Sequence, residues 1–182
     1  MWDKLYKRQI IFDNNILFPE NLAYEDMFWG AIFYLYVNKV YILEENLYHY
    51  FINSESTVLM KNKEYHFDML TANYLKWEDY IRRGAFEKYK EALEYDFIIT
   101  YYFTGIKMLF LRFDEVPYVK YMEIQNTILK LIPNFKQNKY LIKNTSDLSQ
   151  ILLDLIGKKI SKEELELIAK SFREISDMKQ TI

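Results

Sequence analysis

Helical spacing of apolar residues is the feature that most constrains this chain. From Phe67 onward, apolar side chains recur at every third or fourth position, through Leu70, Tyr74, Trp77 and Ile81. Because an α-helix turns once in about 3.6 residues, this spacing gathers them on one face. Only four glycines and three prolines occur in 182 residues, too few for a β-sandwich or a linker array. We therefore predict a mainly α fold, a helical bundle.

Further helices are expected along the C-terminal part, several with recognisable ends. A long helix should cover residues 86–113, with a second half that is apolar on most sides and central to the core. Pro117 suits the first turn of the next helix, where its missing N–H is not needed. Residues 147–156 should form a helix that ends at Gly157. The run Ser161-Lys162-Glu163-Glu164 is a capping box and predicts the start of the last helix.

The N-terminal part has a different, mixed α/β pattern. A nearly all-apolar helix is expected over residues 22–38. The β-branched and aromatic runs 40–43 and 47–51 predict two short strands. The change of pattern near residue 58 divides the chain into a small α/β part, 1–58, and a helical part, 59–182.

Composition and charge exclude several classes of function. The net charge is −2, so the chain lacks the basic field that nucleic-acid binding needs, and we expect no nucleic-acid partner. Cysteine is absent and the histidines are only His49 and His66, so a zinc site would need carboxylate help. His66, near a predicted helix start, is expected at the surface or in a capping role. No run of residues is long and apolar enough to predict a transmembrane segment, and no secretion signal is expected.

Five short motifs in the N-terminal part follow one another in a recognisable order. They are Trp2-Asp3-Lys4-Leu5-Tyr6-Lys7-Arg8, Ile16-Leu17-Phe18-Pro19-Glu20, Tyr24-Glu25-Asp26, Leu47-Tyr48-His49-Tyr50 and Asn53-Ser54-Glu55-Ser56-Thr57. The series resembles the downstream signature of bacterial family 2 glycosyltransferases, which have an A-type nucleotide-diphospho-sugar transferase fold. One difference is Phe51, which stands where the family often has arginine. The resemblance implies that residues 1–58 are the acceptor side of such a domain and that 59–182 are a helical C-terminal extension.

The resemblance implies a catalytic role for one carboxylate. The aspartate of the Glu-Asp motif is the family's general base in inverting sugar transfer, which assigns the role to Asp26. Glu25 points about 100° away from Asp26 on a helix, so it would not point at the acceptor and would have a supporting or structural role. The alternative is structural, because acidic residues in a first helical turn are stabilised by the helix dipole without any catalytic role.

The sugar-nucleotide side of the family pattern is not found in these residues. The family holds Mg²⁺ or Mn²⁺ with the nucleotide sugar through an Asp-x-Asp motif, which this sequence lacks. We therefore expect no cofactor in this chain and a metal with a nucleotide sugar in the full-length enzyme. The donor-binding half is expected to be absent and the chain to be inactive alone.

Remaining expectations concern the acceptor and the partners. Trp29 and His49 are candidates for contact with a glycan acceptor, Trp29 by stacking on a sugar ring. The helix over 22–38 should expose apolar surface that the missing donor-binding half or a second copy would cover. We expect a cytoplasmic location in an enzyme of surface-polysaccharide synthesis. The basic cluster Lys158, Lys159 and Lys162 is expected to be a solvated face; the alternative is weak attraction to the inner face of the membrane. The alternative function is a non-catalytic helical module for interaction or oligomerisation.

Overall fold

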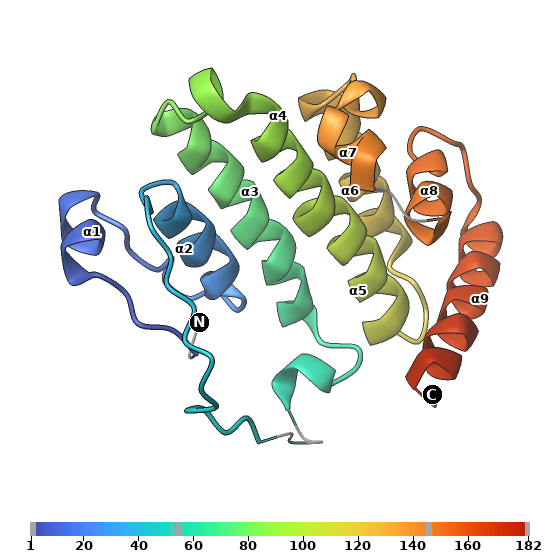
Figure 1. Ribbon diagram of the computed structural model, residues 1–182. Coiled ribbons are helices and arrows are strands. Elements are labelled where there is room, and N and C mark those ends of the chain that lie inside the picture. The colour runs from blue at the N-terminus through green and yellow to red at the C-terminus, as the bar shows by residue number, and fades with distance from the viewer. Residues whose placement is uncertain (1–2, 52, 54–55, 145–146, 181–182) are drawn as a thin grey trace.

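Helices packed side by side make up the fold, and the mainly α prediction is confirmed. The computed structural model describes residues 3–51, 53, 56–144 and 147–180. Its α-helices are α1 (Arg8–Asp13), α2 (Glu25–Tyr34), α3 (Asp68–Arg82), α4 (Phe86–Phe97), α5 (Thr104–Arg112), α6 (Tyr118–Leu131), α7 (Lys139–Asn144), α8 (Asp147–Asp154) and α9 (Lys162–Gln180). Short 3₁₀ turns occupy Thr57–Leu59, Glu64–Phe67 and Phe135–Gln137. Figure 1 shows the helices in sequence from α1 and α2 on one side to α9 on the other, with α3, α4 and α5 between them.

A long helical rod forms the centre of the main core. The six-residue π-helical segment Ile98–Phe103 joins α4 to α5. The long helix predicted over 86–113 is therefore present, with this wider turn inside it and with a kink at Tyr89, whose φ of −123° and ψ of 18° are not helical. Helices α3, α6 and α9 pack around this rod. The side chains of Phe97, Tyr102 and Ile106 are fully enclosed.

The predicted helix ends agree with the structure. Pro117 directly precedes α6, and Gly157 follows α8 with a left-handed φ of +80°. The capping box closes in both directions: the Ser161 N–H donates to the Glu164 carboxylate at 2.8 Å, and the Glu164 N–H donates to the Ser161 hydroxyl at 3.2 Å.

Helix α2 is shorter than predicted and its apolar face is covered. It spans Glu25–Tyr34 instead of 22–38, because Asn21 and Tyr24 have left-handed backbones that cannot belong to an α-helix. Helix α3 packs along α2, and Trp29, Ile32 and Phe33 are buried in a second apolar cluster with Tyr80 of α3 and Leu93 of α4. The expectation of exposed apolar surface on this helix is therefore wrong for its core-facing side. This cluster draws side chains from both sides of the predicted boundary at residue 58.

The two predicted strands do not form. Residues 38–51, called the arm below, have irregular backbone, and no strand occurs among the described residues. The arm exposes large apolar side chains, for example Tyr41 at 89% and Phe51 at 79%. An isolated pair of short strands is marginal in water unless another layer covers one face, and no element of the described chain covers the arm. Exposed apolar surface is thus present mainly on the arm, while α2 exposes only Tyr34, at 50%, among its large apolar side chains.

Candidate functional site

The Glu-Asp pair lies in the first turn of α2. Glu25 is the first residue of the helix and Asp26 the second, and both side chains are half-buried. The N–H groups of a first helical turn favour a negative charge there. Tyr6 packs edge-on against Trp29 at a centroid distance of 5.0 Å, and Trp29 lies three positions after Asp26 on the same side of α2. Burial raises the pKa of the Tyr6 phenol. The turn therefore presents a carboxylate on the side of α2 that faces the N-terminal segment.

The backbone that leads into this turn is strained and is held by residues of the helical part. Asn21 and Tyr24 have φ angles of +53° and +61°, a conformation that costs a residue with a Cβ atom about 1–2 kcal/mol. The Ala23 N–H donates to the Asp68 carboxylate at 3.0 Å. The Tyr24 hydroxyl lies 2.7 Å from Nδ1 of His66. One contact from the 3₁₀ turn Glu64–Phe67 and one from the first residue of α3 thus hold the two residues that precede Glu25.

His66 is enclosed, which corrects the prediction that it lies at the surface. Its ring has no exposed area, and its Nε2 lies 2.7 Å from the Met60 carbonyl oxygen. Because a carbonyl can only accept, Nε2 carries the hydrogen, and in the neutral imidazole Nδ1 then accepts from the Tyr24 hydroxyl. Burial raises the pKa of Tyr24, which keeps this donor protonated.

Trp29 is part of the second apolar cluster. Its side chain is 4% exposed. Phe18 and Phe33 both stack on the indole, at centroid distances of 5.1 and 5.2 Å, and its Nε1–H donates to the Ile16 carbonyl at 3.3 Å. Neither face of the indole is open to a sugar ring in this conformation. Contact with an acceptor stays a prediction, and it would require Phe18, a loop residue that is 45% exposed, to leave the ring.

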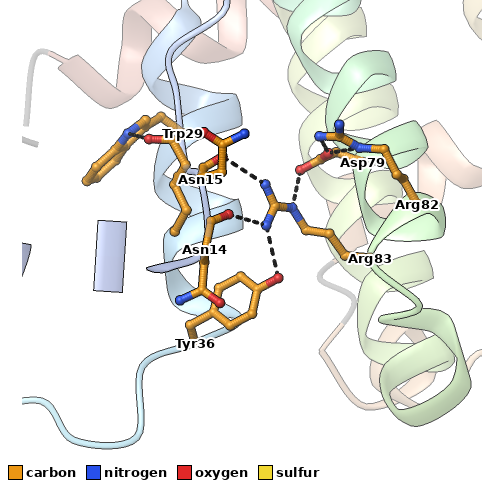
Figure 2. Close-up of polar contacts among 8 residues, drawn as sticks. Asn14, Asn15, Trp29, Tyr36, Asp79, Arg82 and Arg83 are labelled. Carbon is orange, nitrogen blue, oxygen red and sulfur yellow. Dashed lines mark hydrogen bonds and ion pairs between the residues drawn. The ribbon is translucent and has the colours of Figure 1, made fainter. Parts of the chain in front are cut away.

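An arginine at the end of α3 ties the N-terminal segment to the helical part (Figure 2). The Arg83 guanidinium donates to the Asn14 carbonyl at 2.8 Å and to the Tyr36 hydroxyl at 3.0 Å, and it also reaches the Asn15 carbonyl. Its Nε donates to the Asp79 carboxylate at 2.6 Å. Hydrogen bonds to Asp79 and to Tyr36 raise the pKa of Arg83 against the effect of burial. All of these partners belong to the protein, so we interpret the cluster as a structural clamp.

A groove of about 430 Å³ adjoins this clamp. Its walls combine apolar and charged side chains from the loop after α1, from α2 and from α3: Leu17, Phe18, Phe28, Leu75, Glu78 and Arg82. The size falls within the range of about 300–1,000 Å³ that small-molecule sites occupy. Phe28 and Asp26 are two positions apart on α2 and so point about 200° apart. The groove therefore lies on the opposite side of α2 from the Asp26 carboxylate.

A buried lysine pairs with an aspartate beside the π-helical segment. Lys76 of α3 is 1% exposed, and its Nζ lies 2.7 Å from the Asp96 carboxylate and 2.8 Å from the Thr100 hydroxyl. The Tyr80 hydroxyl also donates to Asp96, at 3.3 Å. Burial lowers the pKa of Lys76, and Asp96 opposes this effect. This pair fixes α3 against the rod and is fully used by the protein's own groups.

The predicted site residues are only partly brought together. Glu25, Asp26 and Trp29 share α2, whereas His49 lies exposed on the arm. Sequence reasoning missed His66, because the residue that binds it is 42 positions away. It also missed Asp68, because an acidic residue in the first turn of a helix is an ordinary pattern and does not indicate a contact with a distant residue.

No group of three or more carboxylate and imidazole side chains is arranged to hold a metal ion in the described part of the chain. None of the described helices has the length and apolar character needed to cross a membrane. No protein-family model matches this chain, and no curated protein or solved structure matches it either.

Proposed function

We propose that this chain is the acceptor side of a family 2 glycosyltransferase and that Asp26 is the general base for sugar transfer to a glycan acceptor. The proposal begins from the ordered motifs of residues 2–57 and from the half-buried Asp26 carboxylate in the first turn of α2. An acceptor hydroxyl attacks well only when a positioned base removes its proton. Asp26 supplies that base, and Glu25 has a supporting role without contacting the acceptor.

The single observation that carries the proposal is the uncovered arm. Its β-branched and aromatic residues favour a pleated surface, yet Val40, Tyr41 and Ile42 are 71%, 89% and 78% exposed. Strand-forming sequence that lacks a partner strand is explained if the partner lies outside these residues. We propose that a donor-binding half supplies the sheet, together with a nucleotide sugar and Mg²⁺ or Mn²⁺.

The arm also supports a second candidate function. An exposed apolar segment of this length favours association, so a non-catalytic module that oligomerises through the arm would have the same surface. The two candidates differ in Asp26, which only the first requires.

Substitution of Asp26 separates the two candidates. In a polypeptide that carries both the donor-binding half and this chain, Asp26→Asn should lower the rate of sugar transfer at least about 100-fold, because general-base catalysis contributes about 100-fold to 10,000-fold. Glu25→Gln is the matched control on the same turn and should cost less than about tenfold. Normal turnover with Asp26→Asn would refute the assignment of the base.

A second experiment tests the donor side on this chain alone. Titration calorimetry with uridine diphosphate and Mn²⁺ should show no tight binding, since the chain has no Asp-x-Asp motif. Submicromolar affinity would contradict the proposal that the donor site lies elsewhere.

A further inference from the structure

The first turn of α2 begins where two residues of the helical part hold the preceding backbone. The Ala23 N–H is bonded to Asp68 at 3.0 Å, and the Tyr24 hydroxyl is bonded to His66 at 2.7 Å. Glu25 and Asp26 follow immediately. We propose that His66 and Asp68 are positioning residues for the Asp26 carboxylate, an inference that rests on the proposed function and gives the helical part a role in it.

The start of a helix determines where its first-turn side chains point. Tyr24 is the N-cap of α2 with φ +61° and ψ +25°, and its side chain makes no capping bond. Its carbonyl accepts the Met27 N–H at 3.1 Å, an i→i−3 bond that closes the turn at the start of the helix. If Tyr24 relaxed to an ordinary backbone conformation, this bond would break and Asp26 would turn with the unwound residues.

Local sequence does not explain why the left-handed turn persists. A residue held in a sparsely populated backbone region stays there only when its surroundings fix it, and the side chain of Tyr24 is fixed by His66. His66 is in turn held by the Met60 carbonyl at 2.7 Å. The imidazole has no exposed area while Tyr24 is in place, so the Tyr24 hydroxyl is the partner of Nδ1 in this conformation.

The bond from Asp68 fixes the other side of the turn. Ala23 has no polar side chain, so its N–H is the group through which the turn can be held at this residue. Asp68 is the first residue of α3, and its carboxylate receives that N–H 45 positions away in sequence. Displacement of a catalytic group by about 1 Å can cost about 100-fold in rate, so this pair of contacts has a direct consequence for a base at Asp26.

The variants Tyr24→Phe and Asp68→Ala test the inference on this chain. Each removes one contact and should speed exchange of the Met27 amide hydrogen at least about tenfold, since the bond from Met27 to the Tyr24 carbonyl is loosened. The carboxyl-carbon NMR resonance of Asp26 should move in both variants. Asp68→Asn retains an acceptor oxygen and should restore the exchange rate of the parent chain to within about twofold.

Tyr65→Phe is the matched control. It removes a hydroxyl from the neighbouring residue of the same 3₁₀ turn, where that hydroxyl donates to the Thr57 carbonyl instead of to α2. Its Met27 and Asp26 signals should equal those of the parent chain. Amide exchange at Trp77, in the middle of α3, should be unchanged in every variant and shows that each one is folded.

The outcomes separate this inference from the proposed function. Unchanged Met27 exchange and an unchanged Asp26 resonance in both Tyr24→Phe and Asp68→Ala would overturn the positioning role, and the measurement uses no sugar. In the polypeptide with both halves, Asp68→Ala should lower kcat at least about tenfold while the KM for the nucleotide sugar stays within about twofold, and Asp68→Asn should restore kcat. Normal transfer by Asp26→Asn would instead count against the proposed function.

Discussion

Replacement of Asp96 by asparagine should destabilise the chain much more than replacement of its partner Lys76 by methionine. Lys76 is 1% exposed, whereas the Asp96 side chain is 36% exposed. Asp96→Asn leaves a buried ammonium group without a counter-charge. Lys76→Met removes the buried charge and leaves a carboxylate that water can reach.

The burial of the two groups gives the expected magnitudes. Loss of one partner from a buried ion pair costs about 3–5 kcal/mol, and we place Asp96→Asn near 3 kcal/mol because water reaches part of this site. Lys76→Met should stay within about 1 kcal/mol of the parent chain, since an apolar side chain of similar length fills the space without a desolvation cost. A domain has a free energy of unfolding of about 5–15 kcal/mol, so the difference is measurable.

Urea unfolding followed by circular dichroism at neutral pH measures both variants. The pH dependence adds a second readout, because burial lowers the pKa of Lys76 below its ordinary value of 10.5. Between these two pKa values the unfolded chain binds more protons than the folded chain, so stability rises with pH. Asp96→Asn removes the group that opposes this effect, so the rise should begin at lower pH, and Lys76→Met should abolish it.

Two results would refute this reasoning. The first is an equal cost for the two variants, which would mean that the pair acts only through packing. The second is a cost below about 1 kcal/mol for Asp96→Asn, which would mean that Lys76 is hydrated or neutral when folded.

Three further predictions follow from contacts described above. Arg83→Met should lower the free energy of unfolding, measured by urea titration, by about 2–4 kcal/mol, because Asp79 is 4% exposed and loses a partner. The control Arg82→Met changes a side chain that is 72% exposed and should lower the free energy of unfolding by less than about 1 kcal/mol. Ser161→Ala removes the N-cap of α9 and should cost about 1 kcal/mol, which calorimetry would detect as a lower Tm. Burial raises the pKa of Tyr102 and raises that of Tyr121 to about 12. Above pH 10.5 the folded chain therefore binds more protons than the unfolded chain, and its free energy of unfolding should fall as pH rises. Equal free energies of unfolding at pH 10.5 and 12 would contradict this.

Helices of the bundle could be predicted where their signals are local. The apolar spacing of α3, the capping box at Ser161 and the turn at Gly157 all depend on residues within a few positions of one another. The strands of the arm were predicted from composition, which indicates that residues suit a pleated surface but not that a partner strand exists. The start of α2 was placed too early because two left-handed residues cannot be recognised from spacing.

Much of the candidate site depends on contacts between distant residues. The position of Asp26 in the first turn of a helix could be predicted, because carboxylates at the start of a helix are a local sequence pattern. Nothing near His66 in sequence shows that Tyr24 approaches it, so a buried histidine was expected at the surface. Arg83 binds carbonyls 69 and 68 positions away, and no local pattern predicts such a clamp.

The π-helical segment Ile98–Phe103 has a consequence for how chains related to this one can differ in length. A wider turn holds one more residue while the helices on either side keep their facing. Removal of a single residue there should therefore leave α4 and α5 directed at the same neighbours, whereas removal of a residue within α3 would rotate all that follows by about 100°. Insertions and deletions tolerated during evolution should therefore gather in this one turn of the rod. A sequence alignment that placed the gap before Asp96 instead would assign Lys76 the wrong partner residue in a related chain.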